Sequence, residues 1–114
     1  MLTLYGVYRS RASRPLWLLA ETGIAYDHVP VIQAYRLPEG QARDATLHTA
    51  SPEFLAVNPL GQIPALKDGD LVLTESLAIC LHLARVHGGA LGPADAAEAA
   101  LIDQWALFAA TAVE

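Results

Sequence analysis

The sequence predicts an α/β fold in which a four-stranded mixed sheet carries helices on both faces. Short apolar runs rich in β-forming residues alternate with segments of helical periodicity, and residues 2–33 have the pattern strand, helix, strand. Further along, Asp68-Gly69-Asp70 separates two apolar runs, which is typical of a β-hairpin. A βαβ unit joined to a hairpin and further helices packs compactly as one sheet between helical layers.

Composition indicates one domain with a substantial core. The chain has 114 residues, of which 54% are hydrophobic and 17% charged, and its formal net charge is −5. This negative charge argues against binding to nucleic acid or to an anionic membrane. The sequence shows no secretory signal and no apolar run long enough for a membrane span. A single cysteine permits no intrachain disulfide, so we expect a cytoplasmic protein.

The βαβ unit begins with a buried strand over Leu2–Val7. Ser13 is the expected N-cap of the next helix, because Pro15 is tolerated only in a first helical turn. Gly23 is well placed to end that helix. A second strand over Tyr26–Gln33 should run parallel to the first, with a right-handed crossover. The apolar face of the helix consists of Leu16, Leu19 and Ala20.

The second strand is expected at a sheet edge, because Pro30 has no N–H to donate to a ladder. Residues 34–50 are polar and lack a clean periodicity, so they predict a loop. Ser51 and Pro52 then favour the N-cap and first residue of a helix of about two turns. This helix must stop before Pro59.

Two further helices are predicted after the hairpin. The first starts at Thr74 or Glu75 and ends at Gly88, and after a linker over 88–93 an alanine-rich helix follows over 94–113. Nothing remains in the chain to cover the apolar stripe of the last helix, so we expect it to meet a partner. This order of elements is the thioredoxin-like arrangement. The stripes are Leu77, Cys80, Leu81 and Ala84 on the first helix, and Leu101, Trp105, Phe108 and Ala112 on the second.

A proline, Pro64, opens the first hairpin strand in the segment QIPAL. An ordinary trans proline costs no ladder hydrogen bond at the first residue of a strand. A cis Ile63–Pro64 bond would instead turn the backbone N–H and C=O of Ile63 outward, where an extended peptide ligand could pair with them. The residues alone leave both conformations open.

Glu75 and Ser76 stand at the N-terminus of the helix that follows the hairpin. Free N–H groups and the helix dipole favour an anion there. Together the two side chains suit a zwitterionic ligand, whose carboxylate would bind Ser76 and whose ammonium would bind Glu75. The alternative is that both residues simply cap the helix.

Ser10 and Ser13 lie between the first strand and its helix, the usual place for a site in an open α/β sheet. A hydroxyl there could donate to a ligand thiolate. Lowering a thiol pKa by about 2 takes about 2.7 kcal/mol, which a charge-assisted hydrogen bond and nearby positive fields can supply. The alternative for either serine is helix capping. No Cys-x-x-Cys motif is present, so thiol–disulfide exchange lacks its nucleophile.

The cysteine and the histidines show no further pattern of a site. Cys80 falls on the apolar face of its helix and is expected in the core. His28, His48, His82 and His87 lack the spacing of metal ligands, so no metal site is predicted. His48, in the polar loop, is a candidate contact for the anionic end of a ligand.

Over about residues 2–87 these segments resemble the N-terminal domain of cytosolic glutathione transferases. The matching pieces are LYG, SRASRPLWLLAE, SPEFLAVNPLGQIPAL and LTESLAICLHLA, in that order. The most specific part is the joint presence of Asn58-Pro59, Gly61–Pro64 and Glu75-Ser76. The resemblance implies a thioredoxin-like glutathione-binding domain over 1–87, the linker over 88–93, and the start of an all-α domain over 94–114.

The resemblance also implies how glutathione is held. Ile63, before a cis Pro64, would pair its backbone with the cysteinyl part of glutathione, and Gln62 would contact the same region. Glu75 and Ser76 would hold the γ-glutamyl end.

Four further residues carry implied roles. Ser10 matches the catalytic serine of the theta-, phi- and zeta-like classes, with Ser13 as the second choice. His48 lies near a position that contacts the glycine carboxylate in some classes. Asp103 resembles an aspartate that reaches across a dimer interface to the γ-glutamyl group bound by the partner.

The expected function is therefore a homodimeric glutathione transferase, in which glutathione is the co-substrate and its thiolate attacks a small electrophile. One alternative is a non-catalytic protein-interaction module, and another is a glutathione-dependent isomerase or dehalogenase. Family members normally continue with a full all-helical domain, of which the sequence shows only the first helix. We therefore expect either a truncated or a miniature member, with weak activity and no metal.

Overall fold

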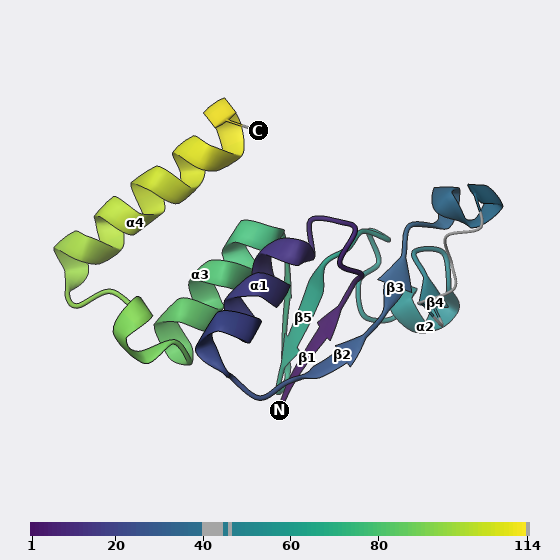
Figure 1. Ribbon diagram of the computed structural model, residues 1–114, viewed down its shortest axis with the longest axis horizontal. Helices are drawn as coiled ribbons and strands as arrows, with labels where there is room; N and C mark the ends of the chain where they lie inside the picture. Colours follow the sequence, from purple (N-terminus) through teal and green to yellow (C-terminus); the bar gives the residue numbers. More distant parts are fainter. Residues whose placement is uncertain (40–44, 46, 114) are drawn as a thin grey trace.

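A computed structural model of the chain shows the predicted mixed sheet between helical layers (Figure 1). The structure describes residues 1–39, 45 and 47–113. The strand order is β2-β1-β5-β6, in which β1 and β2 are parallel and the other neighbours antiparallel. The predicted βαβ unit and hairpin are therefore confirmed. The strands are β1 Leu2–Tyr5, β2 Asp27–Val29, β5 Ala65–Asp68 and β6 Leu71–Thr74.

Two apolar cores lie on opposite faces of this sheet, because successive strand residues point to opposite sides. On one face, helices α1 (Ser13–Thr22) and α3 (Ser76–Val86) lie side by side over the strands (Figure 1). On the other face, the short helix α2 (Pro52–Leu55) inserts Phe54, which is fully buried. The first core contains Leu2, Leu4, Leu16, Leu19, Leu66, Ile79 and Leu83, and the second contains Val31, Phe54 and Ala65.

Helix α1 begins one residue earlier than predicted, because Ala12 and not Ser13 occupies the N-cap position. Helix α1 has no side-chain capping hydrogen bond, and the Ser10 hydroxyl accepts the N–H of Ala12 at 3.1 Å just before the helix. Gly23 ends the helix as predicted, in the left-handed conformation with φ of 71°. The buried face is formed by Ala12, Leu16 and Leu19, at spacings of four and three residues, and Ala20 is exposed rather than part of it.

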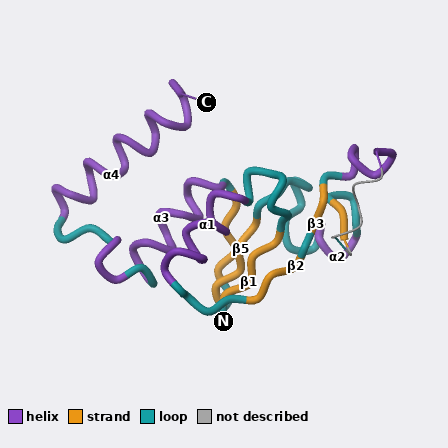
Figure 2. The backbone as a smooth tube through the Cα atoms, in the orientation of Figure 1, coloured by secondary structure: helices purple, strands orange, loops and turns teal. Residues whose placement is uncertain are grey.

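The predicted strand Tyr26–Gln33 is divided at Pro30, whose missing N–H interrupts the ladder. The part before Pro30 is the sheet-edge strand β2, and the part after it joins a separate two-stranded sheet (Figure 2).

The segment 34–50, which was predicted as a loop, also contains regular structure. The additional elements are β3 Val31–Ile32, a 3-10 helix η1 over Ala34–Glu39, and β4 Leu47–His48.

Helix α2 has the predicted start and half of the predicted length. Ser51 is at the N-cap and Pro52 at the first position, but only one helical turn forms. The Ser51 hydroxyl turns back to accept the His48 N–H at 3.0 Å instead of capping the helix. This bond ties α2 to the end of β4.

Helix α3 packs on the sheet with a different face from the one predicted. Ile79 and Leu83 are fully buried, and Ser76 is 7% exposed. Two apolar stripes on this helix both have helical spacing, and contact with α1 and the strands selects between them. The predicted stripe of Leu77, Cys80, Leu81 and Ala84 is only half-buried.

Cys80 is half-buried rather than fully in the core. Burial raises the pKa of its thiol to about 11, against a weaker opposing effect of the Arg14 charge. We expect Cys80 to react with an aromatic disulfide reagent at pH 8 at least about tenfold more slowly than free cysteine, because the reactive thiolate is scarce. Rates in native buffer and in urea check this, and equal rates in the two would contradict it.

After α3 the predicted linker 88–93 forms a short 3-10 helix, η2 (Gly89–Leu91), which folds back on α3. A Cβ at Gly88 would lie 2.7 Å from the Ala84 carbonyl oxygen, so glycine is needed for this close approach. Helix α4 (Ala96–Phe108) follows and is capped by Asp95, which accepts the Glu98 N–H at 2.8 Å.

Helix α4 stands apart from the sheet (Figure 1) and continues into a π-helical turn over Ala109–Val113. An ion pair between Arg85 and Asp103 joins it to α3. Its predicted stripe is open, with Trp105 60% exposed and Phe108 49% exposed. None of the described helices has the length and apolar character needed to cross a bilayer. Glu114, the last residue of the predicted third segment, lies outside the described residues.

Candidate functional site

A cleft of about 820 Å³ opens at one end of the strands of the main sheet. The C-terminal ends of β1 and β6, the N-terminal end of β5 and the N-terminus of α3 all meet there. Segments far apart in the sequence therefore supply its walls. The lining residues include Ser10, Arg11 and Arg14, then Gln33, Tyr35 and Thr49, then Asn58 and Gly61–Pro64, and finally Thr74–Leu77 with Ala110.

The backbone of Ile63 forms part of the cleft wall. The Ile63–Pro64 peptide bond is cis, as the family resemblance implied. Pairing between β1 and β5 ends at Tyr5 and Ala65, two residues beyond Ile63. Among the described residues, the N–H and C=O of Ile63 make no backbone hydrogen bond. These groups are therefore available to an extended ligand in the cleft.

Asn58 holds the loop that carries Ile63. Its side chain is 2% exposed, donates to the Gln62 C=O at 2.8 Å and accepts the Leu60 N–H at 3.1 Å. Gly61 completes the turn with a φ of 63°. Sequence reasoning assigned Asn58 no role of its own, although asparagine before a proline and a glycine is typical of such side-chain-closed turns.

Ser76, the first residue of α3, lines the cleft, and its hydroxyl accepts a hydrogen bond. Its Oγ accepts from Nη1 of Arg14 at 2.9 Å. The hydroxyl proton of Ser76 is left to donate, and the N-terminus of an 11-residue helix adds partial positive charge. This corner of the cleft is suited to a carboxylate.

Glu75, beside Ser76, has a φ of 72° and is the one non-glycine residue with positive φ in the described part of the chain. Such a conformation costs about 1–3 kcal/mol, and residues of this kind cluster at ligand sites. Glu75 occupies the N-cap position of α3, but its side chain makes no capping hydrogen bond. Its carboxylate lies next to the anion-binding corner and can accept from an ammonium group.

The two candidate serines differ in their position relative to the cleft. Ser10 lines the cleft, whereas Ser13 is exposed and is not among the lining residues. The Ser10 hydroxyl donates to the Val7 C=O at 2.6 Å while it accepts the Ala12 N–H. Two arginines, Arg11 and Arg14, also line this wall and add positive charge beside Ser10.

His48 and Asp103 lie outside the cleft wall. Nδ1 of His48 accepts the Ala50 N–H at 3.2 Å, and it is the neighbouring Thr49 that faces the cleft. Asp103 pairs with Arg85 on the same chain. The roles expected of these two residues stay predictions, while Gln62, Ile63, Pro64, Glu75 and Ser76 come together in one cleft.

Comparison of the sequence with known proteins identifies a family that this chain matches. The family model described as glutathione S-transferase, N-terminal domain, matches residues 1–85. Glutathione S-transferase 1 of Zea mays is 40% identical over 104 residues, which are 90% of this chain and 44% of that protein. A zeta class glutathione S-transferase of Euphorbia esula is 39% identical over 83 residues, or 72% of this chain and 32% of that protein.

A solved structure shows the same fold. The theta class glutathione S-transferase of Xanthomonas axonopodis pv. citri, crystallised with glutathione bound, matches with a TM-score of 0.77 and 34% identity. The match covers 97% of this chain and 49% of that one, so the chain spans less than half the length of these relatives. The family match extends from β1 into α3 and includes the lining residues of the cleft except Ala110, and on this basis the chain belongs to the glutathione S-transferase family.

Proposed function

We propose that the cleft binds glutathione and that the chain is a glutathione transferase, which ionises the bound thiol for attack on a small electrophile. The observation that carries this proposal is the convergence of three kinds of group on one cleft: the Ile63 backbone, the pair Glu75 and Ser76, and the Ser10 hydroxyl. The family relationship and the glutathione bound in the Xanthomonas relative support it.

In the proposed complex, the γ-glutamyl end of glutathione occupies the corner at the start of α3. Its carboxylate accepts from the Ser76 hydroxyl and the first N–H groups of the helix, and its ammonium donates to Glu75. The cysteinyl residue extends along Ile63 and pairs with its backbone as an added strand, next to Gln62. This placement directs the thiol toward the loop that contains Ser10.

Ser10 is proposed to donate a hydrogen bond to the glutathione thiolate. Because its proton now points to the Val7 C=O, the hydroxyl must rotate when glutathione binds. The thiol proton leaves to solvent. The sulfur lone pair then forms a carbon–sulfur bond, and the leaving group departs with the electrons of the bond that breaks. This chemistry requires no metal ion, because the stabilised thiolate is itself the nucleophile.

For the whole chain we propose a cytoplasmic homodimer in which residues 1–87 bind glutathione, 88–93 link, and 94–114 begin an all-α domain. The open stripe of α4 supports association, because a soluble monomer rarely leaves such a patch uncovered. His48 is proposed to contact the glycine carboxylate, and Asp103 the partner's ligand. The same open stripe favours a second candidate function, a protein-interaction module without catalysis.

Substitution of Ser10 tests the proposed chemistry. We expect Ser10→Ala to raise the pKa of bound glutathione by about 1–2, equivalent to about 1.4–2.7 kcal/mol, because one hydrogen bond to the thiolate is lost. Ultraviolet absorbance of the thiolate, followed against pH at saturating glutathione, measures this. Ser13→Ala is the matched control and should titrate like the unmodified chain.

Two results would contradict the proposal. An unchanged thiolate titration in Ser10→Ala would remove Ser10 from the mechanism. A chain that binds no glutathione in calorimetry would remove the proposed function as a whole. Binding without any conjugation of an aryl halide would favour the interaction module.

A further inference from the structure

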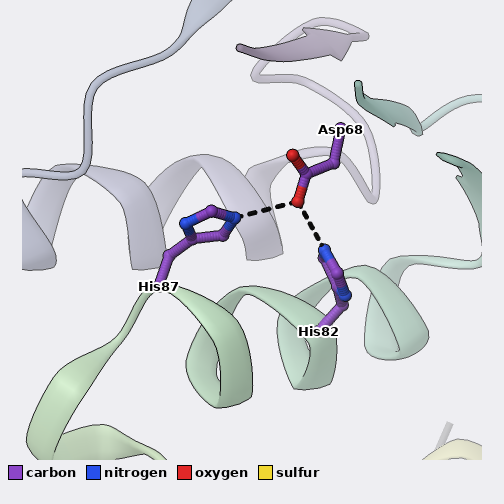
Figure 3. A group of neighbouring side chains, drawn as sticks. All are labelled: Asp68, His82 and His87. Atoms are coloured by element: carbon purple, nitrogen blue, oxygen red, sulfur yellow. Dashed lines mark hydrogen bonds and ion pairs between the residues drawn. The ribbon is translucent and has the colours of Figure 1, made fainter. Parts of the chain in front are cut away.

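Three side chains of types that can ligate a metal, Asp68, His82 and His87, point toward one another (Figure 3). They lie at the end of β5 opposite to the cleft, because Asp68 ends this strand and Pro64, before its start, lines the cleft. Nε2 of His82 lies 2.8 Å from Oδ2 of Asp68, and Nε2 of His87 lies 2.9 Å from the same oxygen. The three ligand atoms all lie within 4.8 Å of one another. Each imidazole thus points its Nε2 atom at the same carboxylate oxygen, Oδ2 of Asp68.

The fold, not the local sequence, makes this cluster. Asp68 is the last residue of β5, at the hairpin turn, whereas His82 is in the last turns of α3 and His87 is its C-cap. The histidines are five residues apart, which is not the spacing of four that puts two ligands on one helix face. His87 joins the cluster because the helix ends at Val86 and the chain turns there. Spacing alone therefore predicted no metal site.

The donor set suits a zinc-type ion. Two imidazole nitrogens and one carboxylate oxygen are preferred ligands of Zn²⁺, at about 2.0–2.2 Å, with water in the fourth position. Three donor atoms around such an ion lie about 3.3 Å apart for tetrahedral geometry. The two Asp68–histidine separations of 2.8 and 2.9 Å are within about 0.5 Å of this value, and the two histidine nitrogens lie no more than 4.8 Å apart. The negative end of the α3 dipole also favours a cation at His87.

The surroundings allow an ion to enter and to be held. The side chains of His82, Asp68 and His87 are 18%, 21% and 31% exposed, so the cluster is neither sealed nor fully solvated. Asp68 and His82 belong to β5 and α3, which pack on each other through the first core, and His87 directly follows α3 as its C-cap. A site on rigid elements keeps its ligands in place before the ion arrives.

We propose that Asp68, His82 and His87 form a binding site for a divalent zinc-type metal ion. The bound ion would tie the β5–β6 turn to the C-terminal end of α3, just before the linker to α4. The site is independent of the proposed glutathione site, because Asp68 lies three residues along β5 from the cleft end, about 10 Å away. Its role is therefore structural rather than part of thiol chemistry.

The test uses the whole chain without a polyhistidine tag. Zn²⁺ is titrated into the chelator-treated protein by calorimetry, and Co²⁺ is added as a spectroscopic probe of tetrahedral coordination. We expect one Zn²⁺ per chain, a higher melting temperature with the ion, and visible Co²⁺ bands of tetrahedral type. His87→Gln and His82→Gln should each weaken Zn²⁺ binding at least tenfold, since a direct ligand is lost.

His48→Gln is the matched control, since it removes a histidine outside the cluster and should leave Zn²⁺ affinity unchanged. His87 is the most exposed of the three side chains, so its variant keeps the test valid if His82→Gln does not fold. The proposal is wrong if Zn²⁺ does not bind, or if it binds equally well to His87→Gln and the unmodified chain. Equal weakening by His48→Gln would also overturn it.

Discussion

Glutathione binding is expected to weaken about a hundredfold or more when Glu75 and Ser76 are both replaced by alanine. Each side chain makes a proposed bond to a charged end of the ligand, and such bonds contribute about 1.5–3 kcal/mol each. The double variant should lose both the hydroxyl donor that Arg14 orients and the carboxylate beside it. Calorimetric titration with glutathione measures the change in Kd.

The matched control for this pair is Glu53→Ala with Ser13→Ala, which removes one carboxylate and one hydroxyl elsewhere. Both residues are exposed, and neither lines the cleft. We expect this control to keep the affinity of the unmodified chain. Equal affinity in the Glu75 and Ser76 double variant and the control would place the γ-glutamyl end elsewhere.

Replacing Gly6 by alanine is expected to destabilise the fold by about 2–6 kcal/mol, a large share of a typical domain's stability. A Cβ at Gly6 would lie 2.5 Å from the Cβ of Ala12, the N-cap of α1, and 3.7 Å from that of Ile63. The residue also has a φ of 150°, which side chains rarely adopt. Urea unfolding measures the loss of free energy.

Gly23→Ala is the control for the two causes of this loss, which are the close contact of the added Cβ and the positive φ. Gly23 also has a positive φ, of 71°, but an added Cβ there meets nothing within 4 Å. We expect this control to cost only about 1 kcal/mol, from the backbone conformation alone. If Gly6→Ala cost no more than Gly23→Ala, close packing at Gly6 would not be what joins α1 to the Ile63 loop.

The Glu75 conformation links the stability of the chain to its proposed function. The positive φ is unfavourable for a glutamate, yet Glu75 lies where the hairpin passes into α3 and where the proposed glutathione site uses a carboxylate. A glycine would relieve the strain and lose the carboxylate. This is the trade between stability and activity expected at ligand sites.

Local sequence was sufficient where a residue's own chemistry decides the conformation. Gly23 ends α1, Pro52 opens α2, and Asp68-Gly69-Asp70 turns the hairpin, each because of a backbone preference that does not depend on the rest of the chain. Pro30 interrupts its strand for the same reason, although the sequence predicted only that this strand lies at a sheet edge.

Other features needed the tertiary structure. Ser10 and Ser13 both lie between β1 and the body of α1, and only the path of the turn shows that Ser10 faces the cleft. The two apolar stripes of α3 have the same periodicity, and packing against α1 and the sheet buries Ile79 and Leu83. Nothing local distinguishes these alternatives.

The sequence by itself determined the βαβ unit, the hairpin, the four-stranded mixed sheet and the family, because periodicity, turn residues and joint motifs are local or additive signals. Only the tertiary structure decided which groups share a site. It placed Ser10, Ile63 and Ser76 around one cleft, and it brought His82 and His87 to Asp68. Sites depend on distances between segments far apart in the chain, and packing of the two cores sets those distances.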